Sequence, residues 1–335
     1  MRTVGLYFLL MIITIKPFLI MAQQEDIKIN SRVDGKMLNI THLKPKHDSF
    51  NEAILFIHGA SFPSELASGF KMNGVSWTGN LSEAGYNAFS LDFLGYGKSD
   101  RYNYMSDKGT EFANNSGGID VIEDIDIAID FILKKLQINK VHLIGHSWGA
   151  AVSGYYSTIH PEKIDKLVLF APVAQRIGPT SWSKPIVSYI DLTPKERIEQ
   201  FISGIPEGKQ MTLEDEIFTK WKIDWLKSDP TATNRNPASI RYPSAWKKDL
   251  YNCWNGKCFF EASKIKNSTL LIRGEWDTVL NKEDANKIFM EMKKTPFKKY
   301  IIIKKGTHVM HLEKSRHQLY AETLFFLKTK INIKK

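Results

Sequence analysis

A serine between two glycines stands where a short apolar run meets a stretch of mostly small residues. Gly145, Ser147 and Gly149 follow the apolar residues 140–144 and precede the small residues 150–154. This order predicts a strand, a sharp turn and a helix, and the glycines suit a turn in which a side chain would clash. A serine at such a turn is exposed for attack on a carbonyl carbon. We therefore predict that Ser147 is a nucleophile rather than a structural serine.

Composition narrows the classes of protein and of ligand. The chain has 335 residues, a length sufficient for one large α/β domain with an insertion or for two domains. Its formal net charge is +10. Its lysines are scattered, and no basic stripe alternates with aromatic residues as a nucleic-acid site requires. No phosphate loop, metal-ligand cluster or nucleotide motif is present. We expect a small-molecule or lipid-like substrate, with no nucleic acid, metal or cofactor.

The first 22 residues have the pattern of an export signal. Arg2 is followed by an apolar run at 5–15, and residues 20–22 offer a cleavage point before polar residues. Lys16 interrupts the apolar stretch, which makes it short for a membrane span. We predict a signal peptide over 1–22 and a periplasmic or secreted protein. An uncleaved signal would instead anchor the chain, and this is the only membrane contact expected.

The two cysteines of the chain lie close together in sequence. Cys253 and Cys258 flank the turn-forming pair Asn255-Gly256. In an exported protein this arrangement indicates a small disulfide, and in the cytosol it would leave two free thiols.

Apolar runs alternate with helical patterns along most of the chain. A parallel sheet covered by helices on both faces follows from this alternation. The expected strands are 27–30, 37–42, 52–59, 86–92, 140–144, 167–172, 268–274 and 300–303, and the expected helices are 119–136, a helix from 150, 282–292 and 313–327. We expect the acidic residues of 119–136 on a solvated helix face.

Residues 172–264 break the alternation. They are rich in proline and lysine, and they contain five of the eight tryptophans, at positions 182, 221, 225, 246 and 254. A helical insertion with its own small core and a lid over an apolar substrate are both consistent with this pattern. We predict a core of residues 23–171 and 265–335, interrupted by a helical cap at 172–264.

Several motifs together resemble the α/β-hydrolase superfamily. They are His58-Gly59, residues 92–99, the serine turn, residues 271–277 and Gly306-Thr307-His308, in the order of that superfamily. The resemblance covers about residues 52–327, and it implies the α/β-hydrolase fold with a Ser–acid–His triad in chain order.

The base and the acid follow from the resemblance and from positions at predicted strand ends. His308 follows the last strand and stands five residues before Glu313, as is typical of the family, whereas its rival His311 is expected to be a packing residue. Asp277 lies past a strand end, and the family pattern favours it over Glu275. Some relatives place the acid after the preceding strand, but residues 171–173 contain no carboxylate.

An oxyanion hole requires two backbone N–H groups. The amide of Trp148, directly after the nucleophile, is one candidate, and Ala60 in the loop after the His58-Gly59 strand is the other. We expect His58 to orient its loop, His146 to pack against its neighbours, and Asp92 to fix the loop that follows it.

Three functions remain open at this point. The first is a serine hydrolase of carboxylic esters, including lipids, with the cap shaping an acyl site. The second is an aminopeptidase similar to the proline iminopeptidases, with cap acids among Glu207, Glu214, Asp215 and Glu216 holding a substrate ammonium. The third is a non-catalytic binding protein on the same fold. Epoxide-opening and halide-removing relatives normally carry aspartate at the position of Ser147, which argues against them.

Overall fold

The computed structural model describes residues 24–46, 50–106, 115–176, 184 and 187–330. The predicted signal segment 1–22 and Trp182 lie outside these described residues. Within the described ranges, none of the helices has both the length and the apolar character needed to cross a membrane.

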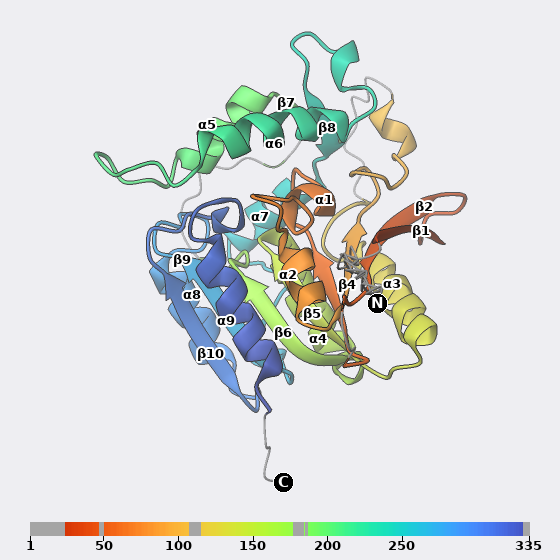
Figure 1. Cartoon of the computed structure of the whole chain (residues 1–335), viewed down its shortest axis with the longest axis vertical. Coiled ribbons are helices and arrows are strands. Elements are labelled where there is room, and N and C mark those ends of the chain that lie inside the picture. Colours follow the sequence, from red (N-terminus) through yellow and green to blue (C-terminus); the bar gives the residue numbers. More distant parts are fainter. Residues whose placement is uncertain (1–23, 47–49, 107–114, 177–183, 185–186, 331–335) are drawn as a thin grey trace, which may run out of the picture.

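An eight-stranded sheet forms the centre of the molecule (Figure 1). The strand order is β1-β2-β4-β3-β5-β6-β9-β10, and every neighbouring pair from β4 to β10 is parallel, whereas β2 is antiparallel to both of its neighbours. The strands are β1 (Gln24–Asn30), β2 (Met37–Leu43), β3 (Ala53–Ile57), β4 (Asn87–Asp92), β5 (Val141–His146), β6 (Ile164–Phe170), β9 (Ser268–Gly274) and β10 (Lys298–Ile303). The predicted mostly parallel sheet is therefore confirmed.

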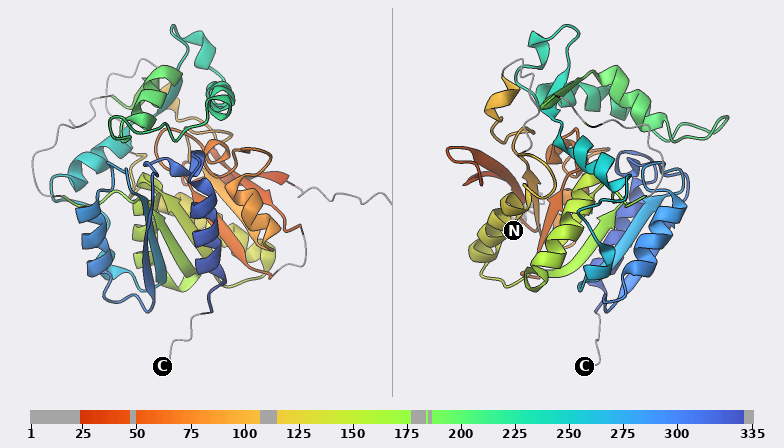
Figure 2. Two further views of the ribbon diagram at one scale, coloured as in Figure 1. Left: turned by 60° about the vertical axis from the view of Figure 1, so that its left-hand side comes forward. Right: turned by 180° about the vertical axis from the view of Figure 1, so that it is seen from behind.

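Helices cover both faces of this sheet. Figure 1 shows α2 and α9 in front of the sheet, and the view from behind in Figure 2 shows α3, α4 and α8 on the opposite face. The α-helices outside the cap are α1 (Ser64–Ala67), α2 (Trp77–Glu83), α3 (Ile122–Leu136), α4 (Trp148–Ile159), α8 (Lys282–Glu291) and α9 (Arg316–Lys328).

The apolar strands of the sequence are the strands buried on both faces. Every residue of β3, β4, β5 and β9 is buried, as expected where helices cover both sides of a parallel sheet. The edge strand β1 instead alternates exposed and partly buried residues. The central strands therefore form a rigid base for the loops at their carboxyl ends.

The described part of residues 172–264, the segment predicted to be a cap and given that name here, forms short elements outside the large sheet. They are β7 (Tyr189–Leu192), α5 (Pro194–Ile202), α6 (Asp215–Lys227), β8 (Ile240–Pro243) and α7 (Ala245–Cys253), and β7 pairs with β8 in a small antiparallel sheet. Figure 1 shows these green and teal elements across one end of the large sheet. The sequence indicated helices here but not the β7–β8 pair.

Trp221 and Trp225 of α6 fasten the cap to the core. Both indoles are fully buried and stacked on each other, with ring centroids 5.5 Å apart. The Trp221 Nε1–H donates to the Leu66 carbonyl at 3.0 Å, and the Trp225 Nε1–H donates to the Ser61 carbonyl at 3.1 Å. These two tryptophans therefore supply the packing core between α6 and the loop after β3.

Two sequence-based details were wrong. Asp124 of α3 is not solvated, since it is fully buried and ion-paired with Arg32 at 3.2 Å. The last helix begins at Arg316 rather than at Glu313. Glu313 is buried in the preceding loop, where its carboxylate binds both the backbone N–H and the hydroxyl of Thr307.

Candidate active site

Ser147 occupies the sharp turn between β5 and α4. Its backbone is in a strained region, with φ 58° and ψ −124°. A Cβ at Gly145 would lie 2.5 Å from the Gly149 carbonyl oxygen, and a Cβ at Gly149 would lie 2.2 Å from the His58 carbonyl oxygen. Both positions therefore require glycine, for the close approach that the sequence pattern indicated.

A chain of hydrogen bonds joins Ser147, His308 and Asp277. The His308 Nε2 lies 2.8 Å from the Ser147 Oγ. On the other side of the ring, the His308 Nδ1 lies 3.0 Å and 3.1 Å from the two carboxylate oxygens of Asp277. The Asp277 side chain is completely buried, whereas the His308 ring is 19% exposed. The geometry lets His308 accept the serine proton at Nε2 while Asp277 holds the Nδ1–H.

Asp277 is fixed in the loop after β9 by backbone donors. Its Oδ1 accepts the N–H groups of Val279 at 2.9 Å and Leu280 at 3.0 Å. The rival carboxylate, Glu275, points elsewhere and accepts the N–H of Lys305 at 2.9 Å. Asp277, and not Glu275, therefore faces His308.

His308 lies in the loop after β10, which is anchored on both sides. The Glu313 carboxylate holds Thr307, as described above, and burial raises the pKa of Glu313. The His146 Nε2–H donates to the His308 carbonyl oxygen at 2.9 Å. His146 therefore does more than pack, because this hydrogen bond positions the backbone of His308, whose ring contacts Ser147.

His311 is packed beneath the site. Its ring is fully buried, 4.5 Å from the His146 ring centroid and 5.9 Å from that of Phe62. Burial and the nearby His308 lower the pKa of His311 to about 3, and burial together with His311 and His308 holds the pKa of His146 well below its usual value. Both imidazoles are therefore neutral near pH 7, and neither contacts the Ser147 hydroxyl.

The loop after β3 lies against the serine turn. A Cβ at Gly59 would be 3.1 Å from the Ser147 Cβ, so the adjoining Ala60 amide is beside the nucleophile. Trp148 is the first residue of α4, where a backbone N–H has no acceptor within the helix. These are the two N–H groups that could face a developing oxyanion.

His58 and Asp92 hold this loop in place. The His58 Nδ1–H donates to the Gly59 carbonyl at 2.6 Å, and the Nε2 accepts the Phe93 N–H at 3.2 Å. Burial lowers the pKa of His58, which keeps the ring neutral. The Asp92 carboxylate accepts the Ser64 N–H at 2.8 Å and the Lys98 N–H at 3.1 Å. His58 and Asp92 thus tie the loops after β3 and β4 together.

A cavity of about 440 Å³ opens over Ser147. Its apolar wall comes from core and cap, and its lining contains no carboxylate among the described residues. The lining includes Phe62, Arg176, Arg197, Gln200, Phe201, Trp246, Leu250 and Trp254. Trp246 and Trp254 therefore line the cavity, whereas Trp221 and Trp225 form the packing core beside it.

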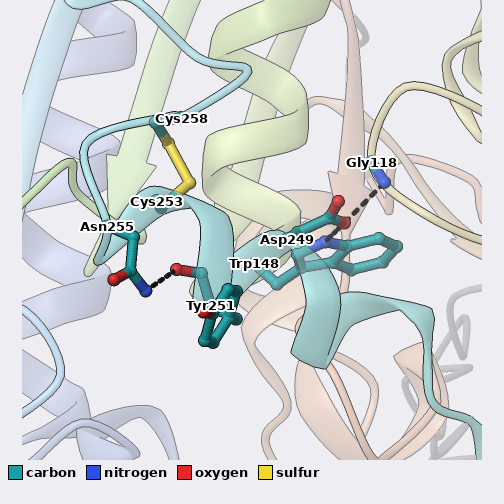
Figure 3. The surroundings of a disulfide bond; sticks show 7 residues. All are labelled: Gly118, Trp148, Asp249, Tyr251, Cys253, Asn255 and Cys258. Atoms are coloured by element: carbon teal, nitrogen blue, oxygen red, sulfur yellow. Dashed lines mark hydrogen bonds between the residues drawn. A yellow bond between two sulfur atoms is a disulfide. The ribbon is translucent and has the colours of Figure 1, made fainter. Parts of the chain in front are cut away.

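The cap contacts the serine turn through α7. Figure 3 shows the Asp249 carboxylate between the Trp148 indole and the backbone of Gly118. Its Oδ2 accepts the Trp148 Nε1–H at 2.8 Å and the Gly118 N–H at 2.7 Å. Burial raises the pKa of Asp249 to about 6. The disulfide Cys253–Cys258 closes the end of the same helix.

Most of the chain matches a known protein family. The profile of the family described as "Serine aminopeptidase, S33" matches residues 73–315. The chain belongs to this family. It is an α/β-hydrolase, as the resemblance of its motifs predicted, and the serine turn and the His308 loop lie within the matched residues.

Individual relatives of this hydrolase differ in their described activities. It is 21% identical to a proline iminopeptidase of Heyndrickxia coagulans, over 56% of this chain and 67% of that protein. It is 30% identical to a putative esterase/lipase of Mycoplasma genitalium, over 41% of this chain and 43% of that protein. The chain thus spans two thirds of the first relative and less than half of the second.

Solved structures agree on the fold. A serine hydrolase involved in carbazole degradation superimposes with a TM-score of 0.59 at 16% identity, covering 92% of this chain and 100% of its own. The naproxen esterase of Bacillus subtilis gives a TM-score of 0.56 at 16% identity, with 92% of each chain covered.

Two contributions to the hydrolase site were not found from the sequence. Arg197 and Asp249 reach the site from the cap, where the sequence has no motif. Both are isolated charged residues in a segment with many charges. Nothing in their sequence distance from Ser147 indicates that they lie near it in the fold. Only the packing of the cap brings them there.

Proposed function

We propose that this hydrolase cleaves carboxylic esters through an acyl-enzyme formed on Ser147. The observation that supports this proposal most directly is the hydrogen-bond chain from the Ser147 Oγ through His308 to Asp277, with its 2.8 Å and 3.0 Å contacts. Nucleophile, base and orienting acid stand at the ends of three different strands of a rigid sheet, which is the arrangement that nucleophilic catalysis requires.

The reaction follows from this arrangement in two halves. The Ser147 Oγ attacks the ester carbonyl carbon while its proton passes to the His308 Nε2. The N–H groups of Trp148 and Ala60 face the resulting oxyanion. His308 then gives the proton to the departing alcohol, which leaves Ser147 acylated. Water attacks the acyl carbon with His308 again as the base, and the carboxylic acid is released.

The lining of the cavity favours esters over peptides with a free amino terminus. Binding of a substrate ammonium requires an unpaired carboxylate, and none lines the cavity among the described residues. Of the cap acids that the aminopeptidase hypothesis needs, Glu214 is ion-paired with Arg316 at 2.6 Å. Glu207, Asp215 and Glu216 are exposed and lie outside the cavity lining.

The aromatic walls favour a substrate with an apolar part. Trp246, Trp254, Phe201 and Leu250 present apolar surface to the cavity, and burial of such surface is favourable by about 25 cal/mol per Å². The volume of about 440 Å³ is in the range of small-molecule sites.

A panel of substrates tests the proposal. Purified protein is assayed with 4-nitrophenyl esters of increasing acyl length beside prolyl and alanyl arylamides, with Ser147→Ala and the exposed Ser106→Ala as matched variants. We expect ester turnover that Ser147→Ala reduces by about four orders of magnitude or more, with Ser106→Ala unaffected. Faster cleavage of the arylamides would favour the aminopeptidase. A folded protein that cleaves neither class would favour the non-catalytic binding protein.

We also propose that the protein is exported. The Cys253–Cys258 disulfide supports an oxidising compartment. Sequencing of the mature amino terminus tests this proposal, with Gln23 expected as the first residue. A membrane-bound protein that retains residues 1–22 would indicate the uncleaved anchor, and a soluble cytosolic protein would contradict export.

A further inference from the structure

Arg197 of α5 is a charged side chain in the cavity whose charge no described residue balances. Its Nη1–H donates to the Gln200 Oε1 at 2.6 Å, and both side chains line the same cavity as Ser147. Its Nε is shielded from solvent and has no hydrogen-bond partner among the described residues. A guanidinium has five N–H donors, and the described contacts use only one of them.

The surroundings of Arg197 are aromatic rather than acidic. Its Cζ lies 4.5 Å from the ring centroid of Phe201 and 5.6 Å from that of Phe62. The nearby Tyr242 and Tyr96 provide no countercharge at neutral pH, because burial raises the pKa of Tyr242 to about 12 and holds that of Tyr96 well above its usual value. Burial also lowers the pKa of Arg197 to about 10, so the side chain remains protonated.

The second arginine of the cavity, Arg176, differs from Arg197 because its charge is paired. Arg176 is ion-paired with Asp284, donates to the Val279 carbonyl, and stacks on Trp254 with its Cζ 4.4 Å from the ring centroid. Its charge is balanced within the protein. The cavity as a whole therefore carries an excess of positive charge that comes from Arg197.

We propose that Arg197 binds a carboxylate of the substrate, so that the preferred substrates are esters with a second, free carboxylate in either the acyl or the alcohol part. A carboxylate matches the planar fork of a guanidinium and can accept two parallel N–H bonds. It also compensates for a partly buried charge that otherwise lacks a partner. This inference rests on the proposed ester hydrolysis and adds the chemical class of the substrate.

Pairs of matched esters test the inference. Mono-4-nitrophenyl glutarate is compared with 4-nitrophenyl pentanoate for the acyl part, and 3-carboxy-4-nitrophenyl butanoate with 4-nitrophenyl butanoate for the alcohol part. We expect one carboxylate ester to exceed its neutral partner in kcat/KM by about tenfold to hundredfold, as hydrogen bonds to a charged group allow. The pair that shows the preference identifies the part of the substrate that carries the carboxylate.

Three variants assign the preference to the side chain. Arg197→Gln is expected to abolish the ratio between the paired esters, and Arg197→Lys to keep part of it because the charge remains. Lys195→Gln removes a charge from an exposed position of the same helix and should leave the ratio unchanged. The ratio cancels any general loss of activity, and melting temperatures show whether each variant is folded.

A binding measurement separates this inference from the proposed reaction. Glutarate is titrated calorimetrically into Ser147→Ala protein with and without Arg197→Gln, and binding that depends on Arg197 is expected. Such binding without hydrolysis of any ester would support the anion site and contradict the reaction. Ester hydrolysis without a carboxylate preference, or a preference that survives Arg197→Gln, would overturn the anion site and leave the reaction intact.

Discussion

The Asp249 carboxylate of the cap accepts the indole N–H of Trp148, the residue directly after Ser147, at 2.8 Å. The same oxygen accepts the Gly118 N–H at 2.7 Å. One partly buried acid therefore links α7, the loop before α3 and the serine turn (Figure 3). The position of the cap over the site depends on a group whose charge changes with pH.

Asp249→Asn is expected to change how stability depends on pH. Burial raises the pKa of Asp249 from 3.8 to about 6, so the folded state holds a proton more tightly than the unfolded chain does. The stability contributed by this group is present at low pH and is lost as the pH rises through about 6. Asparagine does not titrate, so the melting temperature of Asp249→Asn minus that of the wild type should be higher at pH 8 than at pH 4.5.

Thermal unfolding at the two pH values measures this difference, with the exposed Asp215→Asn as the matched control. A difference between Asp249→Asn and wild type that is the same at both pH values would contradict the raised pKa.

His308→Ala and His311→Ala are expected to separate chemistry from packing. His308 contacts the Ser147 Oγ, and loss of the base should lower kcat by about four orders of magnitude or more. His311 makes ring contacts in a buried cluster. His311→Ala should therefore lower the melting temperature but retain most of the activity at a temperature where the variant is folded. Initial rates with a 4-nitrophenyl ester and melting curves provide both measurements. An inactive, folded His311→Ala beside an active His308→Ala would reverse the assignment.

Gly149→Ala is expected to damage both stability and activity. Its Cβ would lie 2.2 Å from the His58 carbonyl oxygen, so the loop that carries the Ala60 amide must move. Overpacking of this kind costs about 1–3 kcal/mol, and displacement of Ala60 should lower kcat more than it raises KM. Gly208→Ala is the control for backbone strain alone, because its φ of +72° is unfavourable for alanine while no heavy atom lies within 4 Å of the added Cβ; it should lower stability and leave kcat unchanged. Normal kcat in a folded Gly149→Ala would remove Ala60 from the oxyanion hole.

The fold could be predicted from the sequence because the patterns that indicate strands and turns are local. The predicted strand 52–59 contains β3, since a buried parallel strand is an uninterrupted apolar run bounded by turn residues. The requirement for glycine at 145 and 149 was equally local, because a tight turn excludes a Cβ.

The cap side of the site has no comparable local signal. Asp249 meets Trp148 at a sequence separation of 101, and Arg197 reaches the cavity from a helix whose pattern is that of an ordinary amphipathic surface helix. Their roles arise from the docking of α5 and α7 on the core. The sequence also predicted Glu313 in the last helix, because its neighbours have a helical pattern. In the structure its carboxylate binds Thr307 within the loop, and the helix begins only at Arg316.

Reduction of Cys253–Cys258 is expected to loosen α7 without unfolding the sheet. The bridge spans a sequence separation of 5, and a loop this short should add about 2 kcal/mol or less to stability because the entropy term falls with loop length. The Cys253 carbonyl accepts the backbone N–H of Arg176 at 2.9 Å, so a loosened helix end should disturb the cavity wall at Arg176 and raise KM more than it lowers kcat. Hydrogen exchange with and without reductant measures the opening directly. Faster exchange confined to α7 and the Arg176 amide is expected, with β5 protected in both states. Global unfolding on reduction, or unchanged exchange in α7, would contradict a purely local role for the bridge.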